Sequence, residues 1–193
     1  MANTVTNIVK IFANDEAIDK INERFDVAGG YSDMVAMAKA FYDEPEIIEG
    51  ERGGLSINWS LDNMGAKWVY IENDIDMDRW NISSANYYPH EFLMRLFELV
   101  VEVDPEAYIV NKYNDESYNP CGVVVYKKDS EGFFSWYDYE ETMTNPTDDM
   151  DWADESYQDK QEEFIYALED FHDKYEEYCI RMIDEGDGRE FGE

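Results

Sequence analysis

The last third of the chain contains a long run in which a large, mostly aromatic side chain returns at alternating steps of four and three residues. Its members are Tyr157, Gln161, Phe164, Leu168, Phe171, Tyr175, Tyr178 and Met182. This spacing places them on one stripe of an α-helix, so the sequence predicts a long amphipathic helix that ends near Gly186. Such a helix draws most of its stability from tertiary packing, so the rest of the chain must supply a surface for it.

The preceding residues alternate between strand-like and helix-like patterns. We expect strands over residues 4–13, 55–61, 66–73, 79–85, 107–113, 121–128 and 132–139. We expect helices over residues 14–25, 34–41 and 89–101. This order predicts an α+β fold, with a ferredoxin-like antiparallel sheet and helices on one face in a core at residues 1–139. An acidic linker or loop at 140–155 and an acidic amphipathic helix and tail at 156–193 would follow.

The chain is strongly acidic, with 46 Asp and Glu, 15 Lys and Arg and a net charge of −31. Half of the acids lie between residues 129 and 193, where only four basic residues occur. A surface of one sign destabilises the compact state by self-repulsion, and a basic partner would relieve that repulsion. The same charge disfavours direct binding to nucleic acid or to an anionic membrane. We therefore expect the partner to be a basic protein that normally binds nucleic acid.

The acids of the C-terminal helix are patterned as well as abundant. Three pairs recur every seven residues, on the side predicted to face solvent: Glu162, Glu163, Glu169, Asp170, Glu176 and Glu177. Asp148, Asp149 and Asp151 would extend this array. Such a row of carboxylates would compete with phosphates for clefts lined by Lys and Arg. Two other readings stay open, an ordinary solvated helix face and a high-salt habitat.

Aromatic residues lie among the acids at Tyr137, Tyr139 and Trp152. Tyr and Trp are enriched at the centres of protein interfaces, so these three are candidate anchors for the same partner. Packing inside the protein is the equal alternative.

Motifs for catalysis or for a cofactor are missing from the sequence. We find no phosphate-binding loop and no zinc or calcium pattern, so we predict no cofactor, no metal site and no enzyme. An enzyme would need a pocket that holds His90 or His172 beside buried carboxylates. Cys121 and Cys179 read as free thiols, and no apolar run is long enough to span a membrane, which favours a cytoplasmic protein.

Several short segments between residues 3 and 128 carry a family resemblance. They are Asn58-Trp59, Asn63-Met64-Gly65-Ala66-Lys67-Trp68, Ser84-Ala85 and Pro89 before a helix, and Tyr113-Asn114-Asp115-Glu116 followed by Gly122. Together they resemble the YubB-type ferredoxin-like domain family of phage and plasmid proteins. The resemblance implies a fold and an origin on a mobile element, without an established activity.

These observations predict a non-enzymatic, phage- or plasmid-encoded nucleic-acid mimic. It would act in the host cytoplasm by blocking the DNA- or RNA-binding groove of a defence protein of the restriction or CRISPR type. The alternative is a protein–protein assembly or regulatory module in which the stripe from Phe164 to Met182 pairs with another chain, including a second copy in a homodimer, and acidity serves only solubility.

Overall fold

The computed structural model describes residues 3–28, 34–48, 54–71, 78–148 and 150–191. Its strands are β1 (Thr4–Phe12), β2 (Val69–Ile71), β3 (Arg79–Ala85), β4 (Tyr108–Asp115), β5 (Cys121–Lys128), β6 (Phe134–Glu141) and β7 (Arg189–Glu190). Its helices are α1 (Asp15–Ala28), α2 (Met34–Phe41), α3 (Ile57–Met64), α4 (His90–Val101) and α5 (Tyr157–Asp184). The α+β class predicted from the sequence is confirmed.

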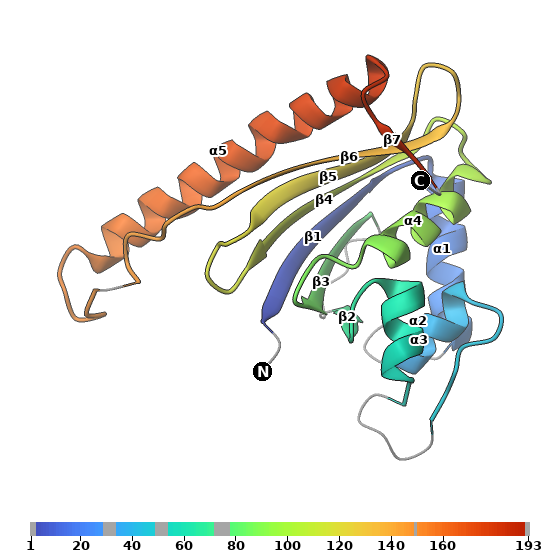
Figure 1. Ribbon diagram of the computed structural model, residues 1–193, viewed down its shortest axis with the longest axis horizontal. Coiled ribbons are helices and arrows are strands. Elements are labelled where there is room, and N and C mark those ends of the chain that lie inside the picture. Colours follow the sequence, from blue (N-terminus) through green and yellow to red (C-terminus); the bar gives the residue numbers. More distant parts are fainter. Residues whose placement is uncertain (1–2, 29–33, 49–53, 72–77, 149, 192–193) are drawn as a thin grey trace.

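The strands form one antiparallel sheet in the order β2-β3-β1-β4-β5-β6-β7. Helices α1, α2, α3 and α4 gather on one side of this sheet, and α5 runs along the other side over β5 and β6 (Figure 1). Among the described residues, the first face is therefore covered by four helices, and the second face is covered in part by α5.

Strand β5 contributes side chains to the packing on both faces of the sheet. Its residues from Cys121 to Tyr126 are all buried, because alternate side chains point to opposite faces and each face has a cover. Val124 and Tyr126 join the main core with α4, whereas Val123 and Val125 pack with Cys179 and Ile183 of α5. A strand covered on both faces reads as a continuous apolar run, which is why its bounds were predicted correctly.

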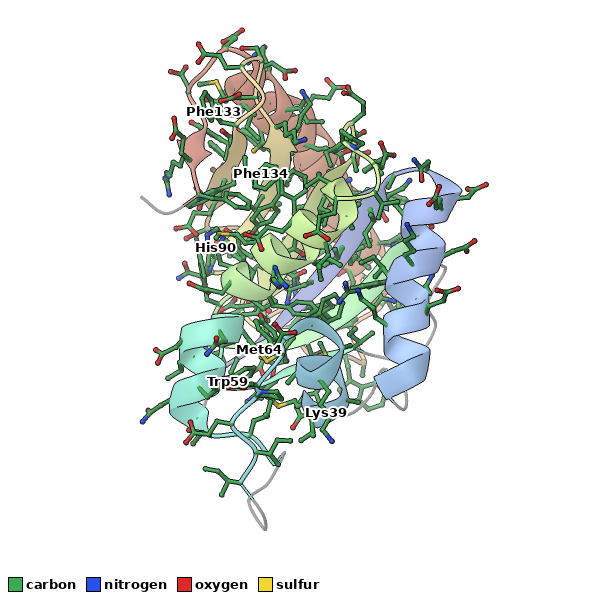
Figure 2. All side chains as sticks on the ribbon, turned by 90° about the vertical axis from the view of Figure 1, so that its right-hand side faces the viewer. Lys39, Trp59, Met64, His90, Phe133 and Phe134 are labelled. Carbon is green, nitrogen blue, oxygen red and sulfur yellow. The ribbon has the colours of Figure 1, made fainter. Side chains whose placement is uncertain are left out.

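Helix α3 replaces the strand expected at residues 55–61, and that prediction is wrong. The Ser56 side chain accepts a hydrogen bond from the backbone N–H of Trp59, which caps the helix start. Gly65, with a φ of 75°, ends the helix in the left-handed conformation that glycine adopts freely. Trp59 and Met64 therefore project from a helix (Figure 2). These caps outweighed the aromatic and aliphatic composition that favoured a strand.

Other strands differ from expectation only in their bounds. The strand expected at 66–73 is shorter, as β2 covers Val69–Ile71 and residues 72–77 lie outside the described part of the chain. The strand expected at 132–139 begins later, because the Phe134 ring packs edge-on against Phe97 at 5.6 Å while Phe133 is 53% exposed (Figure 2). Strand β7 was not predicted, since two residues carry no periodicity.

Candidate functional site

The outer side of α5 carries a row of carboxylates. Glu163, Asp170 and Glu177 are all exposed and follow one another at seven-residue intervals. At about 1.5 Å rise per residue, neighbours in the row are ~10.5 Å apart along the helix axis. The helix is 28 residues long, and its opposite side is held to the sheet by Cys179, Ile183 and other apolar side chains, while Phe164 packs on Tyr118 of the β4–β5 turn. The row is thus mounted on a supported element.

The first member of each acidic pair lies elsewhere on the helix. Glu162 is exposed, but Glu169 and Glu176 line a groove between α5 and the sheet. The prediction that all six acids face solvent is wrong for Glu176, which is half-buried and bonds to the Lys112 ammonium at 2.8 Å. The two neighbouring residues of each pair point in different directions around the helix, so the pairs straddle the boundary between the outer side and the flank. A repeat of seven residues also falls short of two helical turns, so successive pairs shift gradually around the helix axis.

The loop before α5 contributes fewer groups than expected. Asp148 and Asp151 are exposed, whereas Asp149 lies outside the described residues. Trp152 is 82% exposed, which makes it the most exposed of the large apolar side chains in the described part of the chain. It is available to a partner at the N-terminal end of α5.

Tyr137 and Tyr139 are half-buried under α5. The Tyr137 ring packs edge-on against Tyr178 at 5.9 Å, and the Tyr139 ring stacks on Tyr175. A side-chain hydrogen bond with Tyr175, together with burial, raises the pKa of Tyr139 to about 12. These contacts fit the alternative of packing inside the protein, and the proposal that the two tyrosines anchor a partner stays a prediction.

The groove beside α5 gathers basic residues from three strands. Lys10 of β1, Arg79 of β3 and Lys112 of β4 form the sheet wall of a hollow of about 340 Å³. The α5 wall carries His172 with Glu169, Asp173 and Glu176. Lys112 bonds to both Asp173 and Glu176, at 2.7 and 2.8 Å. Although burial lowers the pKa of Lys112, these two carboxylates raise it overall.

His172 is buried on the inner flank of α5, and its Nε2 atom has no hydrogen-bond partner among the described residues. Burial is the main cause that lowers its pKa to about 4, and the nearby Lys112 ammonium acts in the same direction. A backbone hydrogen bond with Tyr113 and the Asp173 carboxylate oppose that shift. The ring is therefore neutral at pH 7.

His90, at the start of α4, belongs to an aromatic cluster on the covered face (Figure 2). Its Nδ1 lies 2.9 Å from the Tyr126 hydroxyl, and its ring contacts Trp136 with a centroid distance of 4.4 Å. Burial, with a smaller contribution from Arg189, lowers the pKa of His90 to about 4. The neighbouring Tyr88 is also buried, and burial raises the pKa of its hydroxyl group well above the usual range. This cluster ties α4 to the sheet.

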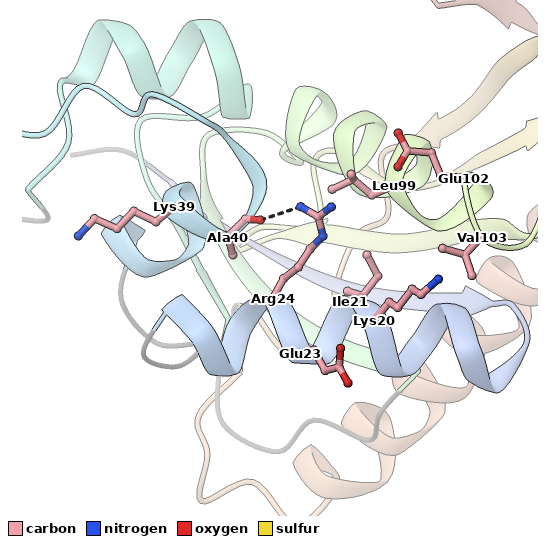
Figure 3. Close-up of a pocket in the computed structure, with 9 residues that line it drawn as sticks. All are labelled: Lys20, Ile21, Glu23, Arg24, Lys39, Ala40, Leu99, Glu102 and Val103. Atoms are coloured by element: carbon pink, nitrogen blue, oxygen red, sulfur yellow. Dashed lines mark hydrogen bonds between the residues drawn. The ribbon is translucent and has the colours of Figure 1, made fainter.

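A hollow of about 850 Å³ lies between α1, α2 and the end of α4 (Figure 3). The Arg24 guanidinium donates to the Ala40 carbonyl at 3.3 Å, while Lys39 points away from the other lining residues (Figure 3). Among the described residues that line it there is no histidine, cysteine or serine. Its charged lining residues are Lys20, Glu23, Arg24, Lys39 and Glu102.

Metal ions have no evident cage here, since the described residues contain no group of three or more His, Cys, Asp or Glu side chains placed to hold one. None of the helices described is long and apolar enough to cross a membrane. Comparisons with protein-family models, with curated proteins and with solved structures found no match to this chain. The geometry of the chain itself must therefore carry the functional argument.

The residues of the groove were missed by sequence reasoning. Arg79 lies 69 positions after Lys10, and Lys112 lies 33 positions after Arg79, so no local motif joins them. The one signal in the sequence was that basic residues are rare, since a chain with 15 Lys and Arg among 193 residues places these three in strands.

Proposed function

We propose that this protein is a non-enzymatic inhibitor that docks the outer side of α5 in the nucleic-acid groove of a basic defence protein. The observation that carries the proposal is the exposed row of Glu163, Asp170 and Glu177 on a helix whose other side is packed on the sheet. A flexible acidic tail would lose conformational entropy on binding, whereas this row is already ordered.

The spacing of the row suits a cleft that binds phosphates. Duplex DNA carries one negative charge per about 1.7 Å of its axis, and a protein cleft places Lys and Arg side chains to meet some of them. Helix α5 is about 42 Å long at 1.5 Å per residue, enough to span roughly one turn of duplex. Asp159 adds an exposed carboxylate near the start of the same helix, whereas Asp173 and Asp184 are exposed but paired with Lys112 and Lys127. The row and Asp159 therefore offer unpaired charge along more than half of the helix.

In this proposal Glu162 and Glu169 provide charges beside the row. Glu176 is not part of the interface, because the Lys112 ammonium neutralises its carboxylate. Asp148 and Asp151 extend the acidic surface beyond the N-terminal end of α5, and Trp152 supplies an exposed aromatic group there. Aromatic side chains often carry a large share of binding energy. We therefore place one end of the interface at this loop.

The family and the origin of the chain form part of the same proposal. Strands β2-β3-β1-β4 follow the strand order of a ferredoxin-like sheet, built from a strand–helix–strand–strand–helix–strand arrangement into which α2 and α3 are inserted. This order supports the resemblance to the YubB-type family of phage and plasmid proteins. An inhibitor from a mobile element would act in the cytoplasm of its host, where restriction and CRISPR nucleases work.

A nuclease-inhibition assay tests the proposal. Purified restriction enzymes and RNA-guided nucleases would be incubated with the protein, and cleavage of a labelled duplex would be followed at several salt concentrations. We expect inhibition of at least one nuclease, and that inhibition should weaken steeply as salt rises. The triple variant Glu163→Gln, Asp170→Asn and Glu177→Gln should lose it.

A matched control removes three charges elsewhere. Asp43, Glu44 and Glu46 are exposed in the loop after α2, so the variant Asp43→Asn, Glu44→Gln and Glu46→Gln changes the net charge equally. This variant should still inhibit. Equal loss of inhibition in both variants would show that only the net charge of the protein matters. Full inhibition by the α5 variant would refute the proposal that the outer side of α5 docks on the nuclease.

The assembly module is the second candidate, and the structure changes its form. The stripe from Phe164 to Met182 packs on β5 and β6, so it is not free to pair with another chain. Exposed apolar side chains remain at Ile165, 45% exposed, and Tyr166, 59% exposed. If these residues form a homodimer, Tyr166→Asp would halve the mass measured by light scattering. A monomeric mass for the unaltered protein would count against this candidate.

A further inference from the structure

The groove between α5 and the back of the sheet provides a second, independent site. Helix α5 covers β5 and β6, and no other described helix lies over the same face of β1 and β3 beside it (Figure 1). The groove lies at this boundary and has a volume of about 340 Å³, which is in the range of pockets that bind small molecules.

The sheet wall of the groove contains two cations that form no ion pair with a described residue, although the Lys10 ammonium lies 4.8 Å from the centroid of the Phe12 ring. Lys10 and Arg79 lie directly opposite each other on β1 and β3, and both are exposed. Like charges in this position repel and destabilise the strand pair. In the described part of the chain no carboxylate forms an ion pair with either residue, although the protein has 46 acids. An anionic group bound between them would remove the repulsion.

The α5 wall has the opposite character. The neutral His172 ring lines the groove, and its buried Nε2 has no hydrogen-bond partner among the described residues, which costs free energy. Glu169 lies one helical turn before it and forms no ion pair with any described residue. Asp173 and Glu176 are already bonded to Lys112. This wall therefore offers a free carboxylate and a ring nitrogen, which suit a cationic hydrogen-bond donor.

We propose that the groove binds a small zwitterion of the amino-acid or dipeptide class. The ligand carboxylate lies between Lys10 and Arg79, and its ammonium group faces Glu169 and the His172 Nε2. A simple anion would leave Glu169 unpaired and would meet the strong negative field of the molecule. A simple cation would leave the repulsion between Lys10 and Arg79 in place. The zwitterion satisfies both walls and adds no net charge.

Calorimetric titration of the full chain with the twenty free amino acids and a set of dipeptides tests this site. The best binder would then be compared with its N-acetyl form, which lacks the ammonium charge, and with its amide, which lacks the carboxylate. We expect each blocked form to bind about tenfold more weakly or worse, as loss of a charge-assisted hydrogen bond implies. Equal binding of either blocked form, or no binding of any probe at millimolar concentration, overturns the proposal.

Two variants locate the binding. Arg79→Gln and Glu169→Gln should each weaken the best binder about tenfold, because each removes one charged partner. Glu163→Gln is the matched control, since it makes the same change on the outer side of the same helix and should leave affinity unchanged. If Glu163→Gln and Glu169→Gln act alike, the effect is one of net charge and the site is refuted. No nuclease enters this experiment, so its result is independent of the inhibitor function.

Discussion

Tyr139 of β6 and Tyr175 of α5 stack face to face, with ring centroids 3.7 Å apart and ring planes within 6° of parallel. Phe171 and Tyr178 surround this pair on the α5 side, with ring centroids 4.8 and 6.0 Å from Tyr175. The stack joins the middle of the long helix to the sheet, and both rings pack against the second core cluster formed by Val110, Val123, Val125, Cys179 and Ile183. It determines how firmly the acidic row is held.

The stack should therefore contribute measurably to stability. We expect Tyr139→Ala and Tyr175→Ala each to lower the free energy of unfolding by about 1–3 kcal/mol, as loss of partly buried aromatic area implies. A double-mutant cycle by urea denaturation should give a coupling energy of about 0.5–1.5 kcal/mol. Tyr166→Ala, at a site 59% exposed, is the control and should change stability little. Strict additivity would contradict the direct contact.

Gly122 of β5 should not tolerate a side chain. A Cβ atom there would lie 2.6 Å from both the Tyr113 hydroxyl and the Tyr139 carbonyl oxygen. Backbone cannot move as readily as the end of a flexible side chain, so we expect Gly122→Ala to cost about 1–3 kcal/mol of unfolding free energy. Thermal denaturation measures this change, with Ser130→Ala in the exposed hairpin turn as the neutral comparison. An unchanged melting temperature would show that Tyr113 can withdraw freely.

Salt should stabilise the folded protein at neutral pH. With a net charge of −31, repulsion between carboxylates outweighs the few ion pairs, and ions at about 0.1 M screen charges beyond ~10 Å. The melting temperature at pH 7 should therefore rise between low and moderate NaCl concentration. Near the sequence pI of about 4.1 the net charge vanishes, and the same salt should have little effect. A melting temperature that falls with salt at pH 7 would indicate that attractive pairs dominate.

His172 should make the fold sensitive to mild acid. Its pKa is lowered to about 4 in the folded protein, against 6.5 in the unfolded chain, chiefly by burial. The unfolded state therefore takes up the proton first, and stability is lost as the pH falls from about 6.5 toward 4, by up to ~3 kcal/mol. Lys112 strengthens the effect, and Asp173 and the Tyr113 backbone weaken it.

The comparison of His172→Phe with the unaltered protein isolates this contribution from the carboxylates and from His90. Urea denaturation at pH 7.5, 6.0 and 4.5 should show a difference between the two proteins that shrinks or reverses toward low pH. The effect arises because the variant has no ring to protonate. A constant difference at all three pH values would exclude a titrating role for His172.

Elements with long periodic patterns were predictable from sequence, and elements defined by local caps were not. The apolar run of β5 and the spacing of Phe164, Phe171 and Tyr178 in α5 report burial directly, because burial repeats along the element. Helix α3 depends instead on Ser56 and Gly65, two residues whose effect exceeds that of the side chains between them. Composition alone pointed to the wrong element there.

In the candidate site, too, the features set by helical spacing were predictable and the features set by contacts between distant residues were not. The outward row of Glu163, Asp170 and Glu177 follows from helical spacing, so it could be foreseen. The inward turn of Glu176 depends on Lys112, a residue 64 positions away that β4 places under the helix. Likewise Lys10 meets Arg79 only because β1 pairs with β3. Contacts between distant strands leave no trace in local sequence patterns.

The second core cluster is small, and this has a consequence for how the protein opens. Five fully buried residues from β4, β5 and α5 form it, far fewer than support the helices on the other face. Helix α5 thus has less apolar support than α4, and its amide protons should exchange before those of α4. Detachment of the helix would scatter the carboxylate row and dismantle the groove in a single step. A ligand held in that groove would resist the opening, so occupancy at one side of α5 would extend the lifetime of the surface on the other.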